Sequence, residues 1–490
     1  MDDLKLFARN DESLYKLVDT VQRFSDAIQM SFGISKCAKL TIKRGKSVQT
    51  GSMPIMSGPE IPELETAGLY RYLGFPEGGG IDHAHSKDVV LSEFKMLSYG
   101  FGIVDWTVAE ITQFDILVRK MMVTSRSLHP RSAVERLYLP HCLGGRGLSN
   151  VEDLYRRRVI LLAHHLRTSD DALVKMCHLL DVSLPSRKSV CSRADAYVAA
   201  LSVDIDLTQA TADEIKNLVC DRQKVSRWET LKNKPLHGKF INWCGSNPVD
   251  LSRSFRWLCE FLHSESESTI FAIQDQVVRT RVYEAKIMNL SVPTLMCRLC
   301  SSHEETIQHL MAGCPMLAPT SYIHRHNLVA SVIHWHLCHT FGIGEIANNW
   351  YSHQPLPVVE NASIKMLWDF DIITVSHIPS NRPDLVVFLK ETPEKILLIE
   401  VSCPADINVL DKENEKITKY QRLAGEMSRT YCQPAVIIPV VFGVSGVVSN
   451  NQKRHLEKIP AFTQLTFANL QKAAILGTVN VLNNINLRVV

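Results

Sequence analysis

The clearest hydrophobic pattern of the chain lies in its last third. Two apolar runs, Leu385–Leu389 and Ile396–Val401, flank a short polar break. Strand-forming residues on both sides of a short loop with a proline predict a β-hairpin. The loop midpoint falls near Thr392, so antiparallel pairing brings Asp384 close to register with Glu400. Because facing Cβ atoms lie about 4.5–5.5 Å apart, we expect these two carboxylates side by side.

Two carboxylates at this separation repel each other unless a cation lies between them, and Mg²⁺ accepts such oxygen ligands while keeping waters. A bound Mg²⁺ ion can activate water and stabilise developing charge on a phosphate. Lys416 and Lys419 lie on a predicted helix and are both suitable lysine partners. The residues leave open which lysine acts, and a buried hairpin with a solvated acid at each end is the simpler alternative.

The surrounding residues predict one α/β domain over 355–490. Pro355 and Pro357 mark a linker into it, and we expect a helix containing Glu360, then a strand over Met366–Phe370. A further core strand is expected at Ala435–Phe442, with helices on both sides of a mixed sheet. Glu360 is either an auxiliary metal ligand or a solvated acid at a helix start.

Earlier in the chain, a group of four residues has the spacing of a zinc site. Cys297, Cys300, His309 and Cys314 form the pattern Cys-x2-Cys-x8-His-x4-Cys. Three thiolates and one imidazole complete a tetrahedral structural zinc site, and buried free cysteines are the alternative. His303 lies too close to Cys300 to replace His309. The spacing therefore predicts a zinc-binding module, with the helix that follows it, over 296–345.

That following helix is rich in histidine. His334 and His336 are two positions apart, so they do not share a helix face and form poor metal geometry. For His326 we expect a core or surface role, in contact with the zinc module or with a phosphate.

The first three hundred residues combine a short α/β start with a long helical part. Asp2 and Asp3 precede a predicted short strand, Leu4–Ala8, and an amphipathic helix that ends at Gly33. Glycine-rich turns and helical patterns follow over 77–181, and further amphipathic helices over 182–295, including Thr211–Leu231 and 255–286. Basic residues that could meet phosphates are Arg156, Arg157, Arg158 and Arg279.

Composition adds few constraints. The 490 residues predict several domains, and a net charge of +3 allows nucleic-acid binding through local patches without requiring it. No run of about 18 apolar residues or basic leader appears, so neither a membrane span nor a signal peptide is expected. The thirteen cysteines have no regular pairing, which favours reduced thiols.

The last domain resembles a known family. Arg382-Pro383-Asp384, the apolar strand, Glu400 sixteen positions on, and Lys416–Tyr420 resemble the restriction-like endonuclease at the C-terminus of site-specific non-LTR retrotransposon proteins, which is similar to PD-(D/E)xK nucleases. The usual lysine two places after the second acid would fall at Ser402 and is absent. The resemblance implies that Asp384 and Glu400 hold Mg²⁺, that Lys416 or Lys419 supplies the cation, and that Arg382 contacts the DNA backbone.

The remaining segments resemble the same family in order. Asp2 and Asp3 are similar to the metal-binding pair of a reverse transcriptase palm, and Tyr70–Phe75 to the primer-grip hairpin. The resemblance implies a partial palm over 1–76, a thumb over 77–181 whose Arg156, Arg157 and Arg158 touch a template–primer backbone, a linker over 182–295, and a zinc knuckle. Because the upstream polymerase motifs have no counterpart, RNA-directed DNA polymerase activity is not expected from this chain alone.

The fold class expected is therefore a multidomain α+β protein: a mostly helical thumb and linker, a small zinc knuckle, and a C-terminal α/β nuclease domain. The resemblance implies an endonuclease with Mg²⁺ and structural Zn²⁺ that nicks target DNA for target-primed reverse transcription. It also implies element RNA as a partner, a nuclear location and no membrane. The alternatives are a catalytically inactive nucleic-acid-binding remnant and a host protein that reuses the nuclease.

Overall fold

The computed structural model describes residues 4–27, 37–43, 46–55, 60–65, 70–72, 75–77, 101, 106–260, 262–344, 346–375, 377–391 and 393–485. The chain forms two compact units, Met1–Asp105 and Trp106–Val490. Asp2, Asp3, the predicted helix end at Gly33 and several short stretches of the predicted palm segment after it lie outside the described residues.

The first unit is a small α/β structure. Helix α1 (Asp11–Ala27) confirms the predicted amphipathic helix, and β1 (Ile42–Lys43) pairs antiparallel with β2 (Lys46–Ser47). Strands β3 (Tyr70–Tyr72) and β4 (Phe75–Glu77) form the expected hairpin. The strand predicted at Leu4–Ala8 was wrong, because no described strand pairs with this segment.

The second unit begins with a helical part. Its elements are α3 (Val108–Thr124), α4 (Glu135–Tyr138), η2 (His141–Leu143), α5 (Val151–Thr168), α6 (Ala172–Ser183), α7 (Val190–Ala200), α8 (Ala212–Lys232), α9 (Gly238–Ser246), α10 (Leu251–Ser254), η3 (Arg256–Cys259), α11 (Ser264–Gln274) and α12 (Arg281–Lys286). Thr211 caps α8 in a capping box with Glu214, so the predicted helix start is confirmed. The continuous helix predicted over 255–286 is divided, because Gln276 adopts a positive φ of 58° after α11 and Thr280 caps a new helix.

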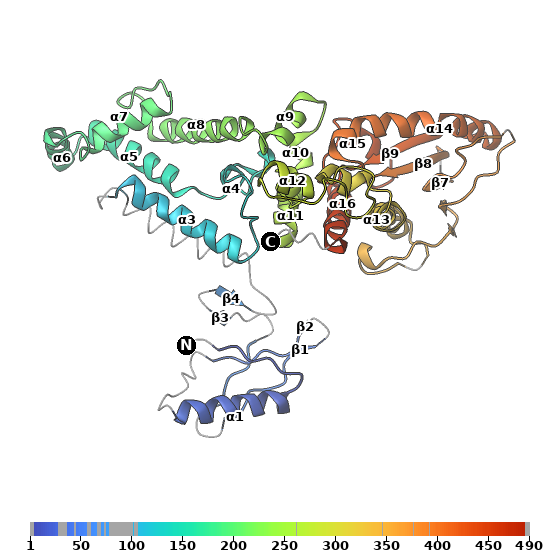
Figure 1. Cartoon of the computed structure of the whole chain (residues 1–490), viewed down its shortest axis with the longest axis horizontal. Coiled ribbons are helices and arrows are strands. Elements are labelled where there is room, and N and C mark those ends of the chain that lie inside the picture. Colours follow the sequence, from blue (N-terminus) through green and yellow to red (C-terminus); the bar gives the residue numbers. More distant parts are fainter. Residues whose placement is uncertain are drawn as a thin grey trace. The chain divides into compact units, whose positions relative to one another are not determined.

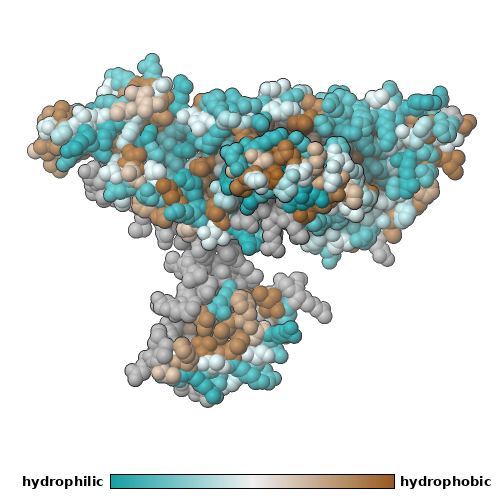
Figure 2. All heavy atoms as spheres, viewed as in Figure 1, coloured by the Kyte–Doolittle hydropathy of each residue, from teal (hydrophilic) through white to brown (hydrophobic). Residues whose placement is uncertain are grey.

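Helix α6 exposes a row of apolar side chains. Leu173, Met176, Leu179 and Leu180 are each more than half exposed. Figure 2 shows brown, hydrophobic spheres at the position where Figure 1 places α6. Across the described part of the chain, no helix combines the length and apolar character that crossing a membrane requires.

The C-terminal part contains the one five-stranded sheet of the described residues. Its strands are β5 (Val358–Glu360), β6 (Ile364–Trp368), β7 (Leu385–Leu389), β8 (Lys395–Ser402) and β9 (Ala435–Val441), in that spatial order. The first four pair antiparallel, and β9 lies parallel to β8. The accompanying helical elements are η4 (His309–Gly313), η5 (Ala318–Tyr322), α13 (Ile323–Phe341), η6 (Trp350–Ser352), η7 (Asp406–Asn408), α14 (Val409–Tyr431), α15 (Gln452–Leu456) and α16 (Gln464–Asn484).

Helices cover both faces of this sheet, as predicted. One face packs against α13 and α16 through a core that includes Val387, Ile399 and Leu470. The other face packs against α14 through Val386, Leu398 and other apolar residues. Figure 1 shows α14 on one side of the strands and α13 with α16 on the other. The fold is thus mixed α and β, with a mainly helical first part.

Glu360 lies on a strand, so the helix predicted around it was wrong. The β-branched Val358 and Val359 favour strand over helix, and β5 pairs with β6 with Glu360 opposite Lys365. Glu360 also contacts Lys390.

A buried ion pair joins two distant segments of the helical part. Arg136 Nε donates to Asp275 Oδ1 at 2.6 Å, and the side chains are 1% and 0% exposed. The other carboxylate oxygen of Asp275 accepts from the Ala133 N–H at 2.8 Å. This pair therefore fixes the segment around α4 against the end of α11.

We expect Arg136→Met to lower the free energy of unfolding by about 3–5 kcal/mol, because the Asp275 charge would remain buried without its partner. Arg279→Met is the matched control, since Arg279 is 56% exposed in its ion pair with Glu284. Its loss should cost less than about 1 kcal/mol. Chemical denaturation followed by tryptophan fluorescence measures both, and equal costs would contradict the assignment.

Candidate metal centre and acidic site

The pairing of β7 with β8 determines where the two predicted acids lie. Leu385 pairs with Ile399, so the next pair outward is Asp384 with Glu400. The backbone N–H of Asp384 donates to Glu400 Oε1 at 3.1 Å. The predicted hairpin and its register are thus confirmed, and the two carboxylates lie at one end of the strand pair.

Side chains from two helices contact these acids. Lys416, on α14, donates to Glu400 Oε2 at 2.8 Å. His326, in the first turn of α13, donates through Nε2 to Asp384 Oδ2 at 3.1 Å. That same oxygen accepts from the Val401 N–H at 2.7 Å. Four ionisable groups from both sides of the sheet therefore converge, and we call Asp384, Glu400, Lys416 and His326 the acidic site.

The surroundings move the pKa values of the two acids in opposite directions. Burial alone would raise the pKa of Asp384, but the hydrogen bond and charge of His326, with Lys416 and the Val401 N–H, bring it below its ordinary value. Burial and the Asp384 charge raise the pKa of Glu400, and Lys416 opposes this only in part. One carboxylate is thus held ionised while its neighbour takes up a proton more readily.

The pKa values of the two basic groups, Lys416 and His326, are both raised. Burial would lower the pKa of Lys416, but the charges of Glu400 and Asp384 raise it overall. His326 behaves in the same way: the effect of burial is exceeded by its hydrogen bond to Asp384, so its pKa is raised. The acidic site therefore combines two acids with two basic groups, and the acids make each basic group hold its proton more tightly.

The structure shows which of the two candidate lysines lies in the acidic site. Lys419 is exposed and its Nζ lies 4.7 Å from the centre of the Tyr420 ring. Of these two lysines, Lys416 is the one that contacts an acid of the site. Arg382 is half exposed and pairs with Asp369 at 2.7 Å, just outside the acidic site.

His326 is the member of the acidic site whose role the sequence analysis missed. The sequence analysis expected His326 to contact the zinc module or a phosphate, and did not predict a carboxylate partner. It lies 58 positions before Asp384, and no sequence pattern links them. The contact arises only because α13 packs against the sheet.

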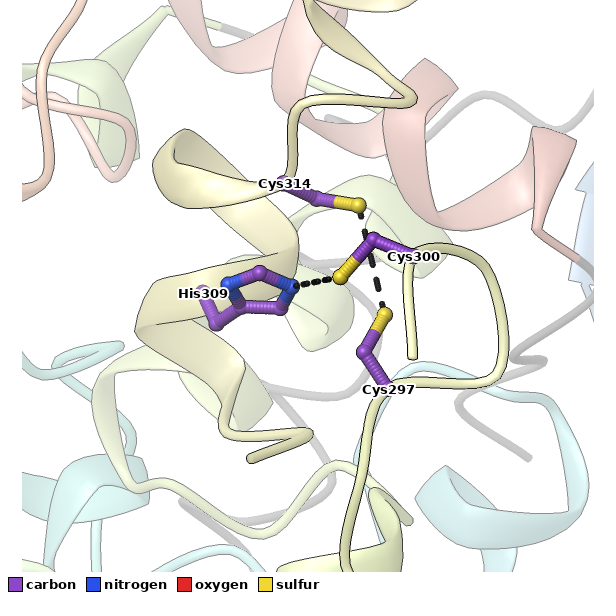
Figure 3. A group of neighbouring side chains, drawn as sticks. All are labelled: Cys297, Cys300, His309 and Cys314. Atoms are coloured by element: carbon purple, nitrogen blue, oxygen red, sulfur yellow. Dashed lines mark hydrogen bonds between the residues drawn. The ribbon is translucent and has the colours of Figure 1, made fainter. Parts of the chain in front are cut away.

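The second site is the predicted cysteine and histidine group. The Sγ atoms of Cys297 and Cys314 are 3.9 Å apart, and Cys300 Sγ lies 3.4 Å from His309 Nε2. All four ligand atoms lie within 4.8 Å of one another, and Figure 3 shows them pointing toward a common centre. This group can hold a metal ion such as zinc, and we call it the CCHC group.

Local structure builds the CCHC group. The Cys297 N–H donates to the His303 carbonyl at 2.7 Å, which closes the turn that presents both first thiols. Arg298 clamps this turn by donating to the fully buried Glu305 at 2.6 Å. The His303 ring stacks on His309 and lies outside the ligand set, as predicted.

The thiols of the CCHC group differ in acidity. Hydrogen bonding from the Ser302 backbone is the main reason that the pKa of Cys300 is lowered to about 6. Burial is the main reason that the pKa of Cys314 is raised to about 11. A divalent cation would favour the thiolate form of both, so metal binding should release a proton from Cys314 more than from Cys300.

The arginines predicted to bind phosphate lie outside the acidic site and the CCHC group. Arg156 pairs with Glu152 and lies over the Tyr197 ring, and Arg157 contacts Cys220. Arg158 is exposed on α5. Arg279 pairs with Glu284.

In the comparisons with known proteins, no protein-family model and no curated protein matches this chain. The geometry of the acidic site and the CCHC group is therefore the basis for any assignment of function.

We expect Cys300→Ala to reduce bound zinc by about one equivalent per chain, since a structural zinc site needs all four ligands. Cys177→Ala is the control, because Cys177 is exposed on α6 and is not part of the CCHC group. Elemental analysis of the purified chains measures this. Unchanged zinc in Cys300→Ala would contradict the ligand assignment.

We expect His326 to titrate above its ordinary pKa of about 6.5, and Asp384→Asn to bring the pKa below that value, because burial then dominates. The pair should add stability that is complete below pH of about 6.5 and is lost as pH rises through the raised pKa of His326. NMR titration of the histidine ring measures the shift. Asp369→Asn is the control, and equal effects of the two variants would count against the pairing.

Proposed function

We propose that this chain is a metal-dependent DNA endonuclease of the PD-(D/E)xK-like class, from the C-terminal part of a site-specific non-LTR retrotransposon protein. The observation that carries the proposal is the register of Asp384 with Glu400, with Lys416 2.8 Å from Glu400. Two adjacent carboxylates that can hold a metal ion and one partly buried lysine are groups suited to hydrolysis of a phosphodiester.

The donor set fits Mg²⁺. Both acids offer hard oxygen ligands, and the raised pKa of Glu400 reflects in part its repulsion by Asp384. A cation held by both carboxylates would relieve this repulsion. When bound there, Mg²⁺ supplies activation of a water molecule and stabilisation of charge on a phosphate.

The side chains around the acids have distinct roles in this proposal. Lys416 remains protonated, so its ammonium group can orient Glu400 and stabilise negative charge on the phosphate. Together with the Val401 N–H, His326 fixes the orientation of Asp384. Arg382, with half of its side chain exposed, would contact the DNA backbone.

The remaining parts would position nucleic acid. Within the proposal, the CCHC group holds structural Zn²⁺, the helices from α3 to α12 act as thumb and linker, and element RNA and target DNA are the partners in the nucleus. Contacts to phosphates would make binding depend strongly on salt concentration. The nick would prime reverse transcription by an intact element.

We expect the purified chain with Mg²⁺ to nick supercoiled plasmid and Asp384→Asn to abolish nicking. Lys416→Ala should lower the rate by about 10²–10³-fold, the usual effect of removing one charge-stabilising donor. Lys419→Ala is the matched control, because this lysine lies one turn away on α14 without contacting the acids, and it should nick at the wild-type rate.

The same plasmid experiment separates the alternatives. If wild type, Asp384→Asn and Lys416→Ala all bind DNA with the same salt dependence and none nicks, the chain is a nucleic-acid-binding remnant and the endonuclease proposal is wrong. If Lys419→Ala and Lys416→Ala lose activity equally, the assignment of Lys416 fails.

A further inference from the structure

A second group of metal-ligand side chains lies in the core, apart from the CCHC group. His334 and Cys338 are one turn apart on α13, and His353 follows η6. Each of the three is at most 5% exposed. His334 Nδ1 lies 2.8 Å from His353 Nε2 and 3.4 Å from Cys338 Sγ, and the three ligand atoms lie within 4.8 Å of one another.

We propose that His334, Cys338 and His353 form a second metal site, which binds a zinc-class divalent ion and fastens the segment after η6 to α13. The proposal does not depend on the nuclease activity. It concerns the stability of the part of the fold that carries His326.

Distances in the group come close to those that a zinc ion imposes. With Zn–N of about 2.0–2.1 Å and Zn–S of about 2.3 Å, tetrahedral geometry separates sulfur and nitrogen by about 3.6 Å and two nitrogens by about 3.3 Å. The sulfur–nitrogen distance of 3.4 Å equals that between Cys300 and His309 in the CCHC group. The nitrogen–nitrogen distance must open by about 0.5 Å, which the ion achieves by displacing the proton that the two rings share.

Without a bound ion, it is hard to explain why two imidazoles are buried in this apolar core. His334 lies edge-on to Trp368, and apolar residues such as Ile333 and Leu337 surround the group in one core cluster. His353 Nδ1 is buried without a hydrogen-bond partner among the described residues, which is uncommon for a polar atom. A metal ion bound at the other ring nitrogen, Nε2, would explain why a polar imidazole lies in this apolar core.

The ligand types select the class of metal. One thiolate with two imidazoles suits zinc and similar transition metals, and excludes Mg²⁺ and Ca²⁺, which take oxygen ligands. Three protein ligands leave the fourth position for a small group such as water.

The neighbouring histidines on α13 do not compete. His336 Nε2 interacts with the Pro460 carbonyl at 3.0 Å, and His339 is exposed beside Trp335. The sequence predicted that His334 and His336 would not bind one metal ion together. The ligand group agrees with this, because it contains His334 with Cys338, four positions later, and does not include His336.

The first test is metal content. The full chain purified with zinc should contain about two equivalents, and His353→Gln should contain about one. His339→Gln is the matched control and should retain both. His353 lies outside the helices, so its substitution leaves α13 intact. One equivalent in the wild type, with no difference between His353→Gln and His339→Gln, would overturn the proposal.

The second test uses Co²⁺ as a spectroscopic probe in the Cys297→Ser/Cys300→Ser chain, which lacks the CCHC group. Co²⁺ should give visible bands of a tetrahedral ion and a near-ultraviolet charge-transfer band with about one-third of the intensity expected for three thiolates. The additional change Cys338→Ser should remove the charge-transfer band, and its persistence would refute the site. If the double variant fails to fold by circular dichroism, the zinc contents of His353→Gln and His339→Gln decide the question.

Discussion

The antiparallel register of β7 with β8 is the constraint on which the acidic site depends. Side chains alternate between faces, so a slip of one residue would move Glu400 to the opposite face and away from Lys416. The apolar residues of both strands prevent this slip, because each face has its own buried core. The carboxylates are thus placed by the packing of residues that have no chemical role themselves.

Given this register, two helices from opposite sides of the sheet complete the site. α14 packs through Tyr420 and Leu423, and this phase of the helix turns Lys416 toward Glu400. α13 packs on the other face and brings His326 to Asp384. Each acid of the pair therefore contacts a basic side chain from a different face of the sheet, and the pKa values of the two carboxylates are moved apart.

Much of this arrangement could be predicted from the sequence because local rules determine it. The two apolar runs and the loop between them define the hairpin and its register, and the spacing from Cys297 to Cys314 defines a metal-ligand group. Contacts between distant helices and strands could not be predicted. The choice between Lys416 and Lys419 depends on the phase of α14 against the sheet, and His326 depends on the packing of α13. The helix predicted around Glu360 was wrong because the strand position of this residue depends on the pairing of β5 with β6.

The start of α13 connects the CCHC group with the acidic site. Tyr322, which immediately precedes this helix, donates to the Leu310 carbonyl at 2.9 Å and accepts from the Cys314 N–H at 3.1 Å. Three residues later, the buried Arg325 donates to the Cys403 carbonyl at 3.1 Å, just beyond β8. His326 comes next. Because a structural metal ion orders the backbone that carries its ligands, an ion in the CCHC group would also order the residues that hold Tyr322. The geometry of the CCHC group and the orientation of an acidic side chain are therefore linked through a single turn of one helix.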